Sequence, residues 1–413
     1  MRKLGWALVF VVILVAAAVV VLPGYVERGQ NHVDGKPLIP VSEQARKLHA
    51  SLTIVDLHAD TLLWKRSLLT RADRGHVDLP RLEQGNVALQ VFSSVTKSPK
   101  GLNYDRNSAD ATDDITLLAI AQAQPVRTWD SLLQRSLFQA RKLGRAVAGS
   151  DGSLIKITDK SGLDRLLVER LDETKRPVLK TPYATPVRGP VPVGAMLSIE
   201  GLHDLEGKSG NLDKLYAAGF RMAGLTHFFD NQLAGSMHGE SKAGLTPFGR
   251  QIVRAMEAKG MIVDVAHCSH ACVADILAMA RRPVVSSHGG VKATCNNNRN
   301  LTDEEIRGVA RTGGVIGIGY WDAAVCDISP HSIARAMRYV RDLVGISHVA
   351  LGSDFDGSTT TRFDVAHLDQ VTQALLDEGF TPDEIRAVMG GNALRVIRAG
   401  LVPMPALVPR AAR

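Results

Sequence analysis

The stretch that decides the fold is residues 54–60, which read Ile54-Val55-Asp56-Leu57-His58-Ala59-Asp60. It begins as an apolar run typical of a buried strand and ends in a His-x-Asp pair. Residues two apart in a strand point to the same side, so His58 and Asp60 are expected to face one space. An imidazole and a carboxylate that converge there suit a divalent cation such as Zn²⁺. For a single pair of this kind, a strand end closed by a salt bridge is the alternative.

Seven further apolar, β-rich runs follow the first one, which covers residues 54–58. They span residues 87–95, 193–200, 220–227, 261–267, 283–288, 313–320 and 348–354. Most are apolar almost throughout, as expected for parallel strands that are buried on both faces. Helical patterns separate many of them. In the helix expected at residues 302–311, Thr302 and Glu305 have the spacing of a capping box.

This alternation of strands and helices predicts an α/β fold, a (β/α)₈ barrel of the TIM type. A doubly wound open sheet is the alternative, but no G-x-G-x-x-G opens a helix after the first run. Residues 101–192, between the second and third runs, are interpreted as an insertion with its own helices. The barrel is expected to cover residues 41–402, followed by a C-terminal tail at residues 403–413.

The amino terminus has the pattern of a membrane anchor. Arg2 and Lys3 precede residues 5–22, which contain no charged residue. As a helix this run would be roughly 27 Å long, close to the ~30 Å hydrocarbon core of a bilayer. The pattern predicts a transmembrane helix within residues 1–25, with the body on the periplasmic or extracellular face. A cleaved signal sequence is the alternative. Residues 26–40 are expected to form a tether.

The bulk composition fits a large globular protein, with 45% hydrophobic and 22% charged residues. The formal net charge is +7, but no long Lys/Arg run is present and aromatic residues make up only 5%. These features argue against nucleic-acid binding. The four cysteines, Cys268, Cys272, Cys295 and Cys326, show no C-x-x-C or zinc-finger spacing. They are expected to be buried free thiols.

The strongest functional signal is that polar residues follow six of the eight runs at the same end. They are His58 with Asp60, Glu200, His227, His267, His288 and Asp354. A barrel brings the carboxyl ends of its strands to one mouth, where active sites are built. Neutral His nitrogens and carboxylate oxygens are usual zinc ligands, and a Glu has two oxygens that can bridge two metals. Two metals roughly 3.5–4 Å apart can polarise a carbonyl and activate a shared water.

In order and spacing, these residues resemble the membrane dipeptidase family of zinc peptidases, also called renal dipeptidases, over roughly residues 54–396. The resemblance is carried by His58-Ala59-Asp60, Ile199-Glu200-Gly201, Leu225-Thr226-His227, Asp264-Val265-Ala266-His267, Ser287-His288, Arg299-Asn300, Gly352-Ser353-Asp354-Phe355-Asp356-Gly357 and Gly390-Gly391-Asn392. It implies a metallopeptidase with two Zn²⁺ per chain that hydrolyses small dipeptides with a free C-terminal carboxylate. It also implies that a hydroxide bridging the metals attacks the peptide bond, and that two chains pair as a homodimer.

The resemblance further implies a role for each matching residue. His58 and Asp60 would bind one zinc, and His267 and His288 would bind the other. Glu200 would bridge the two ions and so belong to the catalytic centre.

Three more residues would act on the substrate. His227 would stabilise the oxyanion of the tetrahedral intermediate. Arg299 would hold the terminal carboxylate, a task that its planar fork suits. Asp354 would handle the proton of the attacking water and pass it to the leaving amine. After His227 the chain reads Phe228-Phe229-Asp230-Asn231-Gln232, which departs from the family pattern and leaves the choice of dipeptide open.

Two other functions remain open from the sequence. One is another metal-dependent barrel hydrolase, such as a deaminase or lactonase, or an enzyme that tailors a peptide metabolite. The other is an anchored binding protein with a degenerate site. The presence of all five expected metal ligands argues against the binding protein.

Overall fold

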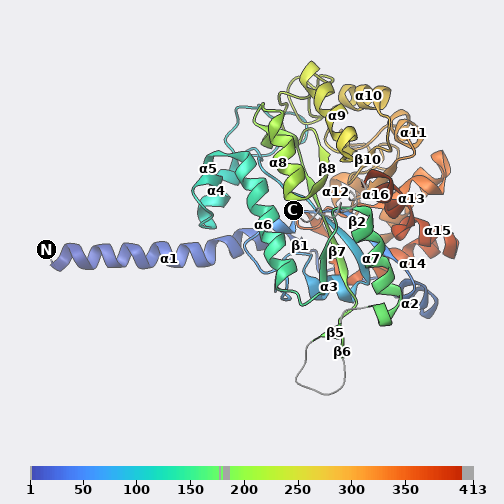
Figure 1. The fold of residues 1–413 in the computed structure, drawn as a ribbon, viewed down its shortest axis with the longest axis horizontal. Helices are drawn as coiled ribbons and strands as arrows, with labels where there is room; N and C mark the ends of the chain where they lie inside the picture. Colours follow the sequence, from blue (N-terminus) through green and yellow to red (C-terminus); the bar gives the residue numbers. More distant parts are fainter. Residues whose placement is uncertain (1, 176–177, 180–186, 402–413) are drawn as a thin grey trace, which may run out of the picture.

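Eight parallel strands close into a barrel in the computed structural model, which describes residues 2–175, 178–179 and 187–401 (Figure 1). The strands are β2 (Ile54–Ala59), β3 (Val87–Phe92), β7 (Val193–Ile199), β8 (Phe220–Gly224), β9 (Ile262–Asp264), β10 (Val285–Ser286), β11 (Val315–Ile318) and β12 (Val349–Leu351). The pairing of β3 with β7, with Leu89 opposite Gly194, closes the ring. The predicted (β/α)₈ barrel is confirmed, and each strand coincides with one of the eight apolar runs.

Helices surround the barrel and cover its strands (Figure 1). They are α2 (Glu43–Ala50), α3 (Leu79–Gln84), α8 (Gly210–Ala218), α9 (Pro247–Lys259), α10 (His270–Met279), α11 (Asp303–Arg311), α12 (Asp322–Val325), α13 (Pro330–Val344), α14 (Asp369–Asp377), α15 (Pro382–Arg386) and α16 (Asn392–Gly400). The short 3₁₀ helices are η1 (Thr61–Leu63), η2 (Glu173–Lys175), η3 (Leu202–Leu205), η4 (Ile346–His348) and η5 (Val365–His367), and η6 (Ala387–Gly391) is a short π-helix. At the start of α11, Thr302 and Glu305 form the predicted capping box.

The strands are buried because helices pack against them. All residues of β2 and β3 are buried, as expected for parallel strands without a solvated face. Val55 and Leu57 of β2 belong to one apolar cluster with Val396 and Ile397 of α16. This packing explains why the apolar runs are nearly continuous in the sequence.

The segment between β3 and β7 contains α4 (Asp114–Ala121), α5 (Arg127–Asp130), α6 (Leu132–Ala148), β4 (Leu154–Lys156), α7 (Lys160–Leu171), β5 (Val178–Leu179) and β6 (Val187–Arg188). The strand β4 pairs in parallel with β7, outside the ring of eight, with Leu154 opposite Val193. This ninth strand of the sheet was not predicted, because three residues carry too little pattern to identify a strand. The strands β5 and β6 pair with each other in antiparallel orientation.

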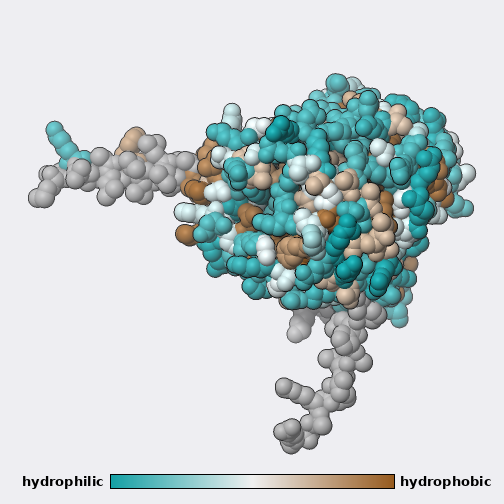
Figure 2. Space-filling model, turned by 90° about the horizontal axis from the view of Figure 1, so that it is seen from above, coloured by the Kyte–Doolittle hydropathy of each residue, from teal (hydrophilic) through white to brown (hydrophobic). Residues whose placement is uncertain are grey.

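At the amino terminus the chain forms a long helix, α1 (Arg2–Gln30), which extends away from the barrel (Figure 1). Within the described part of the chain, no helix is both long enough and apolar enough to cross a bilayer. The predicted transmembrane helix is therefore not confirmed. Apolar side chains gather on the body where α1 meets it (Figure 2). The helix α4, which contacts α1, exposes the apolar side chains Leu117 and Ile120.

The last turn of α1 and the residues after it pack against the body. Glu27 is buried and pairs with Arg66 and Arg74, and β1 (His32–Val33) pairs with β13 (Thr360–Thr361). Part of the segment predicted as a tether is thus in contact with the barrel. The division into anchor, tether, barrel and tail stays a prediction, and the tail at residues 403–413 lies outside the described residues.

Candidate active site

The structure brings the eight predicted site residues into one cluster at the carboxyl ends of the strands. His58 and Asp60 come from the end of β2, and Glu200 follows β7. His227, His267 and His288 follow β8, β9 and β10, Arg299 lies in the loop after β10, and Asp354 follows β12. Their exposed fractions range from 1% to 8%, so all eight side chains are buried. This is the mouth at which a barrel carries its active site.

Glu200 lies at the centre of the cluster, and its two carboxylate oxygens face different residues. Oε1 is 2.7 Å from Nε2 of His267 and 3.1 Å from Nε2 of His288. Oε2 lies 3.8 Å from Nε2 of His58. One carboxylate therefore stands between a pair of imidazoles on one side and a third imidazole on the other, which is the placement that a bridging ligand needs.

The His58 side of the cluster is rich in carboxylates. Nε2 of His58 lies 3.5 Å from Oδ1 of Asp60 and 3.7 Å from Oδ1 of Asp354. Burial alone would lower the pKa of His58, but Asp60 and then Glu200 outweigh it and raise that pKa to about 10. This side of the cluster therefore attracts positive charge.

The other side is rich in neutral imidazoles. Burial, together with the positive charge of Arg299, holds the pKa of His267 well below its usual range, and burial does the same for His288. The Nε2 atoms of these two residues are only 3.0 Å apart, and both face Glu200. A neutral imidazole is the form that binds a metal.

The residues present fit a metal centre. Nδ1 and Nε2 of His58 and Oδ1 of Asp60 are buried and have no hydrogen-bond partner among the described residues. Such atoms are destabilising unless something pairs with them. Three overlapping groups have ligand atoms within 4.8 Å of one another: His58, Glu200 and His288; Glu200, His227 and His267; and His58, Asp60 and Asp354. Nitrogen and carboxylate donors of this kind suit Zn²⁺.

Asp354 is held in an unusual backbone conformation. Its φ is +59°, in the left-handed region, and the residue lies in a tight turn. At Gly357 a Cβ atom would lie 2.1 Å from Oδ1 of Asp354, so only glycine leaves room for the carboxyl group. Burial raises the pKa of Asp354 to about 8, against the opposing effect of His58. A carboxyl group with such a pKa can exchange a proton near neutral pH.

His227 presents Nε2 to the cluster, 3.5 Å from Oε1 of Glu200. Its Nδ1 lies 3.1 Å from the carbonyl oxygen of Lys97, and that carbonyl can only accept a hydrogen bond. Nδ1 therefore carries a proton. Burial lowers the pKa of His227 to about 4, so Nε2 offers a lone pair in the absence of substrate. To stabilise an oxyanion, this nitrogen must gain a proton or a cation when negative charge develops beside it.

Arg299 reaches the imidazole side of the cluster from the loop after β10. Its Nη2 donates to the carbonyl oxygen of His288 at 2.9 Å, and its guanidinium carbon lies 5.7 Å from the ring centre of Trp321. Burial lowers the pKa of Arg299 from its ordinary value, while Asp354 opposes this effect. A buried guanidinium is placed to bind an anionic group of a substrate.

Two carboxylates that support the cluster were missed by the sequence reasoning. Asp56 accepts hydrogen bonds from the backbone N and Oγ of Ser353, at 2.9 and 2.6 Å, and so ties β2 to the turn that carries Asp354. Asp264 accepts hydrogen bonds from the backbone N of Ala266 and Ser287, next to His267 and His288. Asp56 could have been identified, because it lies two residues before His58 and therefore points to the same face of the strand.

An aromatic wall lies on the imidazole side; it includes Phe228, from the loop that departs from the family pattern, and two rings that the sequence reasoning did not place there. The ring of Phe228 stacks on His238 at 4.5 Å between centroids, and both rings contact His267. The Trp321 ring lies 6.0 Å from that of His288. Phe228 and His238 share the loop between β8 and α9, whereas Trp321 follows β11, so neither periodicity nor a local motif could have grouped all three.

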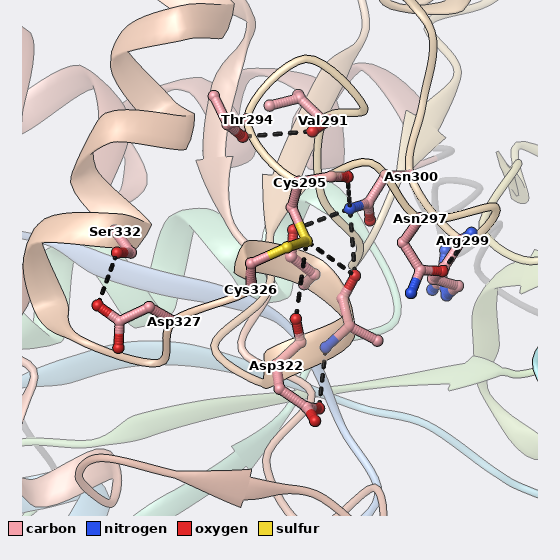
Figure 3. The surroundings of a disulfide bond; sticks show 12 residues. Val291, Thr294, Cys295, Asn297, Arg299, Asn300, Asp322, Cys326, Asp327 and Ser332 are labelled. Atoms are coloured by element: carbon pink, nitrogen blue, oxygen red, sulfur yellow. Dashed lines mark hydrogen bonds between the residues drawn. A yellow bond between two sulfur atoms is a disulfide. The ribbon is translucent and has the colours of Figure 1, made fainter.

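The loop that carries Arg299 is tied to the segment after β11 by a disulfide bond between Cys295 and Cys326 (Figure 3). Beside it, Nδ2 of Asn300 donates to the carbonyl oxygens of Cys295 and Ala324. The expectation of four free thiols is therefore wrong for Cys295 and Cys326. These two residues follow β10 and β11, which are neighbours in the barrel. Cys268 and Cys272 are free and buried, as expected.

The fold and the cluster together define a parallel β/α barrel with a candidate metal centre at its mouth. The family model of membrane dipeptidases, peptidase family M19, matches residues 186–401, which is just over half of the chain. The chain therefore belongs to the membrane dipeptidase family.

One named relative is similar to this chain in sequence, and solved structures are similar to it in fold. The protein named Dipeptidase aclJ from Aspergillus oryzae is 34% identical over 220 residues, covering 50% of this chain and 51% of that protein. The match thus spans about half the length of this curated relative. The probable dipeptidase PvdM from Pseudomonas aeruginosa shares 18% identity and a TM-score of 0.67, over 87% of this chain and 98% of that one. A metallopeptidase from Rhodobacter sphaeroides, liganded with a phosphinate mimic of L-Ala-D-Ala, shares 18% identity and a TM-score of 0.65, over 84% and 99%.

Proposed function

We propose that the chain is a zinc-dependent dipeptidase with two Zn²⁺ per chain. The observation that carries this proposal is the position of Glu200, whose two oxygens face separate sets of buried ligand atoms. In the proposal, His58 and Asp60 hold one ion, His267 and His288 hold the other, and Glu200 bridges them. When bound, the metals would polarise the carbonyl of the peptide bond and activate a water.

The chain's own residues would supply the proton transfers and the electrostatic support. Asp354, whose carboxyl group lies against the cluster, would accept a proton from the attacking water and deliver it to the leaving amine. His227 would stabilise negative charge on the carbonyl oxygen through Nε2 once that nitrogen has gained a proton. The carbonyl of Lys97 holds the ring in the orientation that this role needs.

The proposed substrate is a small dipeptide with a free C-terminal carboxylate, which Arg299 would bind. The structurally similar metallopeptidase from Rhodobacter sphaeroides carries a mimic of such a dipeptide. The homodimer that the resemblance implies stays a prediction.

Metal content and hydrolysis of a dipeptide panel test the function together. Two zinc ions per chain with turnover would support it, and a metal-loaded protein that cleaves no dipeptide would overturn it.

Arg299→Met keeps the length of the side chain and removes the guanidinium. Losing a buried charged partner weakens binding by about 2 kcal/mol or more, so KM for dipeptides should rise about 30-fold. KM for the methyl esters should change little, and an equal effect on both substrates would contradict the assignment of Arg299.

We also propose that the barrel works in an oxidising compartment, on the periplasmic or extracellular side of a membrane. The Cys295–Cys326 disulfide supports this location, because disulfides persist in such compartments and are rare in the cytosol.

Replacing both Cys295 and Cys326 by serine should destabilise the protein and loosen the Arg299 loop. A cross-link between residues 31 apart is worth about 3–4 kcal/mol by loop entropy. Denaturant unfolding should show this loss, and KM for dipeptides should rise. Alkylation of the protein taken from cells should label two cysteines under denaturing, non-reducing conditions. Labelling of all four would contradict the proposed location.

A further inference from the structure

Tyr104 belongs to the segment between β3 and α4 and reaches across to the mouth of the barrel. Its ring meets those of Phe228 and His238 edge-on, with centroids 5.8 and 5.3 Å apart. Its hydroxyl oxygen lies 3.2 Å from Nε1 of Trp321, the residue whose ring faces Arg299 and His288. The side chain therefore stands one layer outside the proposed metal ligands, on the Arg299 side.

The backbone around Tyr104 is fixed in this position by hydrogen bonds to two other loops. Nδ1 of His238 donates to the carbonyl oxygen of Tyr104 at 2.6 Å, and Nδ2 of Asn298 donates to the same oxygen. The backbone N of Asn107 donates to the carbonyl oxygen of His238 at 2.7 Å. Asn107 Oδ1 in turn accepts from the backbone N of Asn103 at 3.0 Å. A group held this firmly needs little ordering when a ligand binds.

The hydrogen bond to Trp321 decides what the Tyr104 hydroxyl can do. An indole N–H can only donate, so the tyrosine oxygen is the acceptor. The hydroxyl proton must then be donated elsewhere, and no other hydrogen bond of this hydroxyl is present among the residues that the structure describes. Burial raises the pKa of Tyr104 to about 12, so the proton is retained at neutral pH. Both Arg299 and Asp354 interact electrostatically with this phenol.

We propose that Tyr104 is a substrate-binding residue whose hydroxyl donates a hydrogen bond to the C-terminal carboxylate held by Arg299. This inference rests on the proposed dipeptidase function. In it, the guanidinium supplies the charge and the phenol supplies a second, neutral donor on the same side of the cluster. Tyr104 and Arg299 come from loops that are far apart in the sequence. Asn298, the neighbour of Arg299, is 194 positions from Tyr104. Together the two donors would distinguish a free carboxylate from an amide or a longer peptide.

The test compares Tyr104→Phe with the unmodified protein, both loaded with zinc, on L-Ala-L-Ala and on its C-terminal amide. Phenylalanine keeps the ring contacts and removes only the hydroxyl. A hydrogen bond to a charged group is worth about a 10- to 100-fold change in affinity, so KM for the free dipeptide should rise by about that factor. Turnover at saturation should stay within about twofold, because the hydroxyl binds ground state and transition state alike. KM for the amide should not change.

Tyr339→Phe is the matched control, because the Tyr339 hydroxyl bonds to Asp303 on the outer helices. It should leave both KM values unchanged. A purely structural role of Tyr104 would alter KM for dipeptide and amide equally, and this result would overturn the inference, as would an unchanged KM for the dipeptide. If the unmodified, metal-loaded protein cleaves neither this dipeptide nor the rest of the panel, the proposed function itself fails. The two failures are therefore distinguishable.

Discussion

Glu200→Gln is expected to remove most of the bound zinc and of the activity while leaving the fold intact. Glutamine has the shape of glutamate, so packing around residue 200 is preserved. It carries no negative charge, however, and one of its two terminal atoms becomes an NH₂ group that can only donate. In the native chain Oε1 faces the Nε2 atoms of His267 and His288, while Oε2 faces His58. An amide cannot offer a lone pair in both directions.

The expected loss in kcat/KM is about 10³-fold or more, because removal of a metal removes both its polarising charge and its activated water. Zinc content should fall below two ions per chain, and thermal unfolding of the metal-free forms should differ little. Glu240→Gln is a matched control. Glu240 pairs with Arg106 at the surface, so zinc content and activity should be unchanged by this substitution. Normal hydrolysis by Glu200→Gln would show that this residue does not bridge two metals.

The barrel could be predicted from the sequence because its signals are local. Each strand is a buried apolar run of a few residues, and in six of the eight a polar site residue lies at or shortly after the end of the run. Closure then places Glu200, His267 and Asp354 together without any further information. The pairing of β4 with β7 could not be predicted, because it depends on tertiary contact and not on the pattern of three residues.

The parts of the site that could not be predicted depend on residues far apart in the chain. The hydrogen bond between Tyr104 and Trp321 spans 217 positions, and that between Asp56 and Ser353 spans 297. Cys295 and Cys326 become neighbours only because β10 and β11 are adjacent in the ring. Sequence reasoning thus identified the residues that end strands and missed the ones that support and cover them.

Asp354→Asn is the substitution that separates proton transfer from metal binding. Asparagine tolerates the left-handed region, where Asp354 has a φ of +59°, so the tight turn should be preserved. The amide also fits the space that Gly357 leaves beside the carboxyl group. It cannot accept a proton from water near neutral pH, and general acid–base catalysis contributes about 10²- to 10⁴-fold. We expect kcat to fall by about that factor, with KM nearly unchanged.

The zinc content of this variant decides between two roles of Asp354. Its Oδ1 lies 3.7 Å from Nε2 of His58, and the ligand atoms of His58, Asp60 and Asp354 form one of the three close groups. If Asp354 transfers the proton, two ions per chain should remain bound while turnover is lost. If one ion is lost with the activity, Asp354 is a ligand and another group must carry the proton. The exposed Asp342, changed to asparagine, should alter neither quantity. Full activity of Asp354→Asn would exclude both roles, because an isosteric amide can neither take up a proton near neutral pH nor replace an anionic ligand.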